Sequence, residues 1–131
     1  MSATSLALMT LVIPDYDQAA AFFTKVLDFA LIEDSDLGEG KRWVVVGGQT
    51  GGRILLAKAK GDEQHAAIGN QFGGRVGLFL QTDDFAATHR KLSDAGISFE
   101  ESPRRESYGT VAVFSDPFGN RWDLIEYEKT A

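Results

Sequence analysis

The 131-residue sequence contains no cysteine, only two histidines, and fewer basic than acidic side chains. The absence of cysteine excludes a disulfide framework, a thiolate metal site and a cysteine nucleophile. The chain has 13 Lys and Arg residues against 19 Asp and Glu residues, which gives a net charge of -6. Because such a charge repels a phosphate backbone, nucleic acid is not an expected partner.

The sequence also lacks a long hydrophobic run. Its N-terminal stretch "MSATSLALMTLVIPD" has no basic region, and the apolar run stops at Pro14 and Asp15, too soon to span a bilayer. We therefore expect a first strand here, a cytoplasmic protein and no membrane partner. No GxSxG motif is present either, so no Ser-His-Asp arrangement can be assigned. The 44% hydrophobic and 24% charged residues are ordinary for a folded domain.

Two stretches of the chain begin alike, namely "TLVIPDYDQAAAFFTKVLDFAL" from Thr10 and "FLQTDDFAATHRKLSDAGISF" from Phe79. Each consists of an apolar run, an acidic helix cap and a helical pattern, with Asp15 and Asp84 as the expected N-caps. Three strand patterns follow each helix: "FALIED", "RWVVVGG" and "GRILLAKA" after the first, and "ISFEES", "TVAVFSD" and "NRWDLIEY" after the second.

The two halves align at an offset of about 68 to 69 residues, which indicates a helix one residue longer in the first half. A unit that reads strand, helix and three strands, present twice, predicts an α+β fold built from a duplicated βαβββ module. We expect one domain over residues 1–131, with modules at about 5–60 and 74–128. The connector, about 61–73, contains a short helix from Asp62 to Gly69 and a flexible glycine-rich joint instead of a phosphate loop.

This pattern resembles the vicinal oxygen chelate superfamily, the glyoxalase, bleomycin-resistance and extradiol dioxygenase group. The resemblance rests on "TLVIPDYDQAAAFFTKVLDF", "LFLQTDDF" and above all "DPFGNRWDLIEY". The combination "AIGNQFGGRV", "TDDF" and "YGTVAVFSDPFGN" is similar to a bacterial glyoxalase-like subgroup whose functions are mostly unassigned. The resemblance implies that each module folds into a curved mixed sheet and that two modules form a cup.

Metal-using members of this superfamily carry ligands on the first and last strand of each module, commonly two His and two Glu. The resemblance places these positions at Leu8, Leu55, Gly77 and Asp123. Three of these residues have no coordinating side chain, and one aspartate does not hold a divalent ion against water. We therefore expect no cofactor and no metal at the family position, so that a divalent metal is possible only at another position.

Alternation along the last strand predicts that Arg121 and Asp123 share one face and that Trp122 and Leu124 share the other. The same reasoning on the repeat predicts a mostly apolar pocket in which Gly77 makes room for a ligand. The candidate ligand-binding residues are Leu8, Thr10, Arg53, Leu55, Phe72, Gly77, Phe79, Gln81, Tyr108, Arg121 and Asp123.

Asp123 admits several interpretations. It can meet a polar or cationic ligand, it can act as a general base whose proton affinity is raised by apolar walls, or it can form a structural ion pair with Arg121 or Arg53. His65 and His89 map to no site position, and His89 is expected to pack at the outer face of the sheet. The segment "SPRRESYG" is either a lid that carries Tyr108 or a solvated loop.

We therefore expect a glyoxalase-like protein that binds or sequesters a small organic ligand in a metal-independent cup, as bleomycin-resistance members do. The resemblance also implies a homodimer in which two chains complete the cups. The alternative is an enzyme, a glyoxalase-type lyase, isomerase or dioxygenase with a displaced metal or with Asp123 as its catalytic base. A third possibility is a cup filled by its own side chains, in a protein that acts through its dimer surface.

Overall fold

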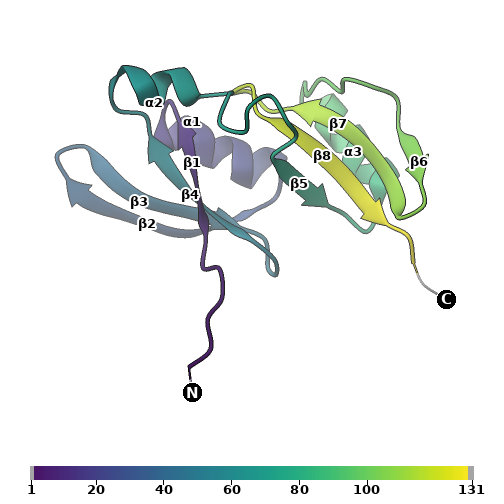
Figure 1. The fold of residues 1–131 in the computed structure, drawn as a ribbon, viewed down its shortest axis with the longest axis horizontal. Helices are drawn as coiled ribbons and strands as arrows, with labels where there is room; N and C mark the ends of the chain where they lie inside the picture. The colour runs from purple at the N-terminus through teal and green to yellow at the C-terminus, as the bar shows by residue number, and fades with distance from the viewer. Residues whose placement is uncertain (1, 130–131) are drawn as a thin grey trace. The chain divides into compact units, whose positions relative to one another are not determined.

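The computed structural model describes residues 2–129, which divide into two units. The first unit runs to Ala67, and the second begins at Ile68. Each unit contains one four-stranded sheet with a helix beside it (Figure 1). Within residues 2–129, no helix combines the length and the apolar character needed to cross a bilayer.

The first unit contains one mixed sheet of order β1-β4-β3-β2, in which only the β1–β4 pair is parallel. A glycine-containing turn joins β3 to β4, as the glycine pairs at 47–48 and 51–52 predict. Its elements are β1 (Met9–Ile13), α1 (Tyr16–Ala21), η1 (Phe22–Val26), β2 (Ala30–Gly38), β3 (Lys41–Gly47), β4 (Arg53–Lys58) and α2 (Gly61–Ala67).

The second unit repeats this topology, with the order β5-β8-β7-β6 and a parallel β5–β8 pair. Its elements are β5 (Leu78–Gln81), α3 (Phe85–Asp94), β6 (Arg104–Glu106), β7 (Gly109–Ser115) and β8 (Arg121–Tyr127). The identical strand order in both units confirms the α+β fold of two βαβββ modules.

Both module helices begin at the predicted aspartates. The Asp15 carboxylate accepts the backbone N–H of Gln18 at 2.8 Å, and the Asp84 carboxylate accepts that of Ala87 at 3.1 Å. These bonds satisfy backbone donors that the first turn of a helix leaves free. The second helix ends before Gly96, whose φ of 90° suits the left-handed position that follows a helix.

The extra residue of the first module lies in a π-helical turn. The first module helix consists of the 6-residue α1 and the 5-residue η1, whereas α3 has 10 residues. A π-turn widens a helix to accommodate one additional residue without changing where the helix begins or ends. The predicted difference of one residue in helix length is thus confirmed.

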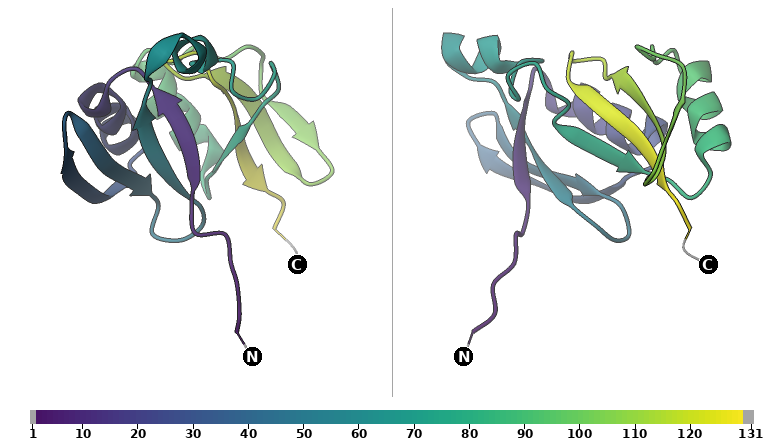
Figure 2. Two further views of the ribbon diagram at one scale, coloured as in Figure 1. Left: turned by 60° about the vertical axis from the view of Figure 1, so that its left-hand side comes forward. Right: turned by 45° about the vertical axis from the view of Figure 1, so that its right-hand side comes forward.

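Each module helix covers one face of its own sheet, as the right-hand view of Figure 2 shows for α3. In the first unit, this helix face contains the fully buried Leu11, Val44 and Leu56. In the second unit, the corresponding helix face contains Phe114, Trp122 and Leu124, also fully buried. Because side chains alternate along a strand, Thr10 and Leu55 in the first unit and Asp123 in the second project from the opposite faces.

The expected strand "ISFEES" at residues 97–102 is present only in part: Phe99 forms an isolated bridge with Phe114, and the continuous strand beside β7 is the three-residue β6. Pairing with β7 does begin earlier, because the Glu100 N–H donates to the Val113 carbonyl at 2.8 Å. The Glu101 carboxylate then accepts the hydrogen bond from the Val113 N–H in place of a backbone carbonyl. Pro103 has no N–H with which to continue the ladder. The strand is therefore interrupted and resumes at Arg104.

The turn before β8 is organised by the buried side chain of Asp116. One carboxylate oxygen accepts the backbone N–H groups of Phe118 and Asn120, both at 2.9 Å. The other accepts the Asn120 side-chain amide and the Trp122 indole N–H, both at 3.0 Å. Gly69 packs on this turn so closely that an added Cβ would lie 2.6 Å from the Phe118 carbonyl oxygen.

Replacement of Asp116 by alanine leaves these buried donors without their acceptor. We expect Asp116→Ala to lower the free energy of unfolding by about 3–5 kcal/mol, because buried donors lose charge-assisted hydrogen bonds. Urea denaturation followed by circular dichroism measures the loss. Asp83→Ala, an exposed control one residue before an N-cap, should change stability by less than about 0.5 kcal/mol. Equal effects of the two substitutions would contradict the role of Asp116.

Candidate functional site

Asp123 lies in the middle of β8, between Phe79 of β5 and Val113 of β7. These residues face away from the helix side of the sheet, together with Arg121 and Ile125 at alternate positions of β8. We call the surface formed by Phe79, Val113, Arg121, Asp123 and Ile125 the Asp123 face. On it, a half-exposed aromatic ring lies beside an acid, since Phe79 is 63% exposed.

The Asp123 side chain is largely buried, between Phe79 and Val113 of the neighbouring strands. The residue is 9% exposed, and its Oδ1 atom is buried without a hydrogen-bond partner among residues 2–129. Loss of hydration raises the pKa of this carboxyl; the nearby positive charge of Arg104 opposes the shift, and the negative charge of Glu101 adds to it. The carboxylate is thus an acceptor that the described chain leaves unused.

The ion pair between Asp123 and Arg121, one of the expected alternatives, is wrong. The Arg121 guanidinium instead binds both oxygens of Glu100, at 2.8 and 2.9 Å, and donates to the Gly74 carbonyl at 2.9 Å. The hydrogen bonds from Arg121 lower the pKa of Glu100. Arg121 therefore ties the glycine-rich joint to the start of β8 and does not neutralise Asp123.

Arg104, whose positive charge acts to lower the pKa of Asp123, also forms its ion pairs with other residues. Arg104 donates to Glu101 at 2.8 Å and to Glu106, which flank it in sequence. Glu101, Glu106 and Asp123 thus place three carboxyl groups near a single guanidinium. The local charge of this region favours a cation or a hydrogen-bond donor.

The expectation that Gly77 makes room for a ligand is wrong. The ring of Phe72 occupies the place where a Cβ of residue 77 would lie. The Phe72 carbonyl accepts the N–H of Arg75, which closes the turn that holds this ring. The glycine is required by an internal packing contact, which places the Phe72 ring at the start of β5.

The first unit presents a plainer surface at the equivalent positions. Leu55 pairs with Thr10 in β1 and with Val45 in β3, and these residues project away from the helix face. Leu8 precedes β1, which begins at Met9, and Arg53 is the exposed first residue of β4. Around Leu55 this face carries the Thr10 hydroxyl and aliphatic groups, with Arg53 two residues away on the same side of β4, whereas the second unit has a carboxylate at the equivalent position.

Two predicted site residues lie at the margins. Gln81 ends β5 on the same side of the sheet as Asp123 and is exposed. Tyr108 is 47% exposed in the turn between β6 and β7, and its carbonyl accepts the backbone N–H of Glu128 at 2.8 Å. The segment "SPRRESYG" therefore contains β6 and a tight turn.

The described residues do not fit a metal ion at the family position. Of Leu8, Leu55, Gly77 and Asp123, only Asp123 has a donor atom in its side chain. Across residues 2–129, no three His, Cys, Asp or Glu side chains converge as a metal site would require. The chemistry available at Asp123 is that of a single carboxyl group: hydrogen bonding, ion pairing and proton transfer.

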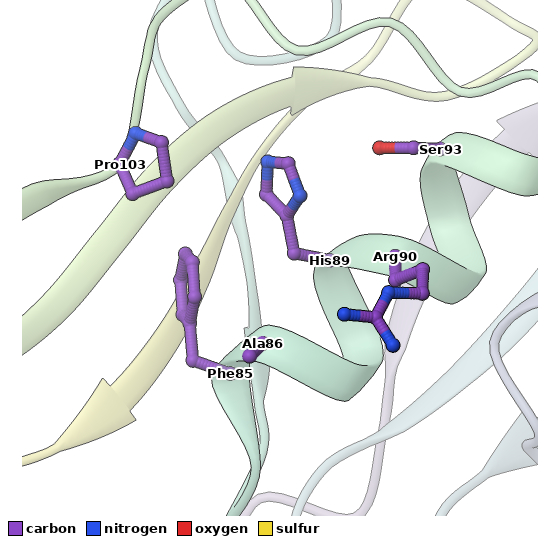
Figure 3. A pocket seen from close by; sticks show the side chains of 6 residues that line it. All are labelled: Phe85, Ala86, His89, Arg90, Ser93 and Pro103. Atoms are coloured by element: carbon purple, nitrogen blue, oxygen red, sulfur yellow. The ribbon is translucent and has the colours of Figure 1, made fainter.

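The structure also shows a depression that the sequence pattern did not reveal, lined by Phe85, His89 and Pro103 among others (Figure 3). His89 packs on the outer side of the second unit, as expected, with its ring 4.0 Å from that of Phe99. The spacing of Phe85 and His89 on one helix was readable in the sequence. The contribution of Pro103 was not, because it depends on how the segment before β6 returns to the helix.

The raised pKa of Asp123 makes a pH-dependent prediction. A carboxyl whose pKa is higher in the folded chain than in the unfolded chain stabilises the fold at low pH, and this contribution is lost as the pH rises through the folded pKa. Asp123→Asn removes the titration. The stability of Asp123→Asn relative to the unmodified protein should therefore increase between about pH 4 and pH 8. Urea denaturation at several pH values measures this difference; a constant difference, like that expected for exposed Asp83→Asn, would contradict the burial of the charge.

Comparison with known proteins places this geometry in context. The model of the Glyoxalase/Bleomycin resistance protein/Dioxygenase superfamily matches residues 5–124. An uncharacterized protein of Shewanella frigidimarina (strain NCIMB 400) is 50% identical over 125 residues, which cover 93% of each chain. The crystal structure of UcmS2 superimposes with a TM-score of 0.79 at 29% identity, covering 95% of this chain and 98% of that one.

A further solved structure is that of TnmS3, described as an antibiotic binding protein from Streptomyces sp. CB03234. It is 26% identical, with a TM-score of 0.71, and the match covers 98% of this chain and 99% of TnmS3. The family match extends over both modules and includes the last strand as far as Leu124. The chain therefore belongs to the Glyoxalase/Bleomycin resistance protein/Dioxygenase superfamily.

Proposed function

We propose that this protein binds a small organic ligand on the Asp123 face, without a metal, in the manner of a sequestering protein. The observation that carries the proposal is the Asp123 carboxylate, which is 9% exposed, has an unpartnered Oδ1 atom and lies beside the exposed ring of Phe79. A buried acceptor without a donor is unfavourable by about 1–3 kcal/mol, and a ligand that brings a donor relieves this penalty.

The surroundings of Asp123 favour a planar, cationic ligand. The ring of Phe79 offers a surface for stacking, and a cation over an aromatic ring gains further stabilisation. The excess of carboxyl groups over guanidinium around Arg104 and the net charge of -6 act in the same direction. Phe72 and Ile125 would supply apolar contacts at the margins.

Metal-independent binding is supported by the set of side chains at the four family positions. Leucine, leucine and glycine supply no ligand atoms there, and one carboxylate is too few for a stable divalent site. The description of TnmS3 as an antibiotic binding protein supports small-molecule binding as a role for this fold.

A homodimer is the second part of the proposal. A twofold partner would supply further walls beside the Asp123 face to complete a cup. The cytoplasmic location expected from the N-terminal sequence stays a prediction.

An enzymatic role is the alternative, and the raised pKa of Asp123 is the observation that favours it. A carboxyl with a raised pKa is a better general base, as a glyoxalase-type lyase or isomerase requires. Asp123 would then remove a proton from a carbon or oxygen of the bound ligand. The guanidinium groups of Arg104 and Arg121 are already paired with glutamates, so neither is free to stabilise negative charge that develops on the ligand.

The binding proposal predicts a charge-selective thermal shift. Planar aromatic compounds of matched size with a cationic, neutral or anionic substituent are compared by differential scanning fluorimetry. A cationic compound at ten times its Kd should raise the Tm by about 4–8 °C. Asp123→Asn should weaken its binding about tenfold, because a charge-assisted hydrogen bond is lost.

The controls separate the parts of this proposal. Asp83→Asn removes an exposed carboxylate and should leave the affinity unchanged. Elemental analysis of tag-free protein prepared without chelators should find no stoichiometric metal after dialysis. Chromatography of the recovered ligand should show it unaltered, whereas turnover would favour the enzymatic alternative. A panel without any hit, or binding insensitive to Asp123→Asn, would contradict the assignment of the site.

A further inference from the structure

The outer side of the second unit carries an open depression of about 450 Å³ between α3 and the segment that precedes β6 (Figure 3). Its volume lies within the roughly 300–1,000 Å³ of typical small-molecule sites. It belongs to the helix side of the sheet, because ring contacts run from Phe85 through His89 and Phe99 to Phe114, which stacks on Trp122. The depression is therefore separate from the Asp123 face. Its lining residues are Phe85, Ala86, His89, Arg90, Ser93 and Pro103.

Flat rings form the floor of this depression. The His89 ring lies 4.0 Å from the Phe99 ring, with 23° between the planes, and 5.8 Å from the Phe85 ring, with 28° between the planes. Pro103 stands across from Phe85 in the close view (Figure 3). Because these rings are anchored to the buried Phe114 of β7, the floor is a fixed surface suited to another flat ring.

Polar groups without partners form the rim. Among residues 2–129, neither the imidazole nitrogens of His89, nor the guanidinium of Arg90, nor the hydroxyl of Ser93 has a hydrogen-bond or ion-pair partner. By contrast, the guanidinium groups of Arg104 and Arg121 are held by glutamates. None of the six lining residues is acidic, so a carboxylate entering the depression meets donors and no like charge.

We propose that this depression is a binding site for a small planar aromatic carboxylate. The aromatic ring of the ligand packs on Phe85, His89 and Pro103, and its carboxylate accepts hydrogen bonds from Arg90 and Ser93. The aromatic floor and the rim of hydrogen-bond donors together indicate this ligand class. The chain as a whole is negatively charged and disfavours anions, so a carboxylate is attracted by the local donors and not by the overall charge. The site does not depend on any function of Asp123.

Benzoate is the probe, and the two histidines of the chain are the reporters. In two-bond ¹H–¹⁵N spectra of tag-free protein, benzoate at millimolar concentrations should shift the His89 imidazole signals in a saturable way. The signals of His65, which lies on α2 with its Nδ1 atom 2.8 Å from the Gly61 carbonyl, should stay in place. Benzamide retains the ring without the charge, and acetate retains the charge without the ring, so both should bind more weakly.

Three variants complete the test. Arg90→Ala should raise the Kd for benzoate about three- to fivefold, as expected for an exposed ion pair. Lys60→Ala removes the same charge from an exposed site in the first unit and should leave the Kd unchanged. Ala86→Trp fills the depression from the exposed side of α3 and should abolish the shift. The proposal is overturned if His89 shows no saturable shift, if His65 shifts equally, or if Arg90→Ala binds benzoate as the unmodified protein does.

Discussion

The hydrogen bonds of the Asp116 carboxylate are the interaction on which the second module depends. They gather two backbone donors of the turn and two side-chain donors from Asn120 and Trp122 onto one buried acid. The bond to the Trp122 indole fixes which face of β8 is turned toward α3. Because successive residues of a strand point in opposite directions, the same bond determines that Asp123 projects from the other face. One structural acid thereby positions the acid on which the proposed function rests.

Asp116 and Asp123 are both buried, but their carboxyl groups are stabilised to different extents by hydrogen bonds. Asp116 has a donor for each of its oxygens from within the chain, so its burial stabilises the turn. Asp123 has an unpartnered oxygen, and its pKa is raised by loss of hydration. The Oδ1 atom of Asn120 is also buried without a partner, but among the described residues Asp123 alone combines an unsatisfied oxygen with a raised pKa, and such a group is where function is expected. The contrast with Leu55, at the equivalent position of the first module, shows that the fold itself does not require an acid there.

The duplicated module, the N-caps at Asp15 and Asp84 and the face assignment of Asp123 could be predicted because they follow from local patterns. The position of β6 could not be predicted, because the Glu101 side chain replaces a backbone carbonyl as the acceptor for the Val113 N–H. The partner of Arg121 and the contact of Phe72 with Gly77 depend on long-range packing of the glycine-rich joint. Sequence periodicity carries no information about such contacts, and the outer depression escaped prediction for the same reason.

The π-helical turn of the first module has a consequence for how the two halves diverged. An added residue within a regular α-helix would rotate every later side chain by about 100° and misalign the strand that follows. The wider turn at Phe22–Val26 confines that rotation to a single loop of the helix. The halves could therefore change in length while β1 and β5 kept equivalent partners in β4 and β8. The two sheets therefore keep the same strand order and register although they carry different residues at equivalent positions, leucine at 55 and aspartate at 123.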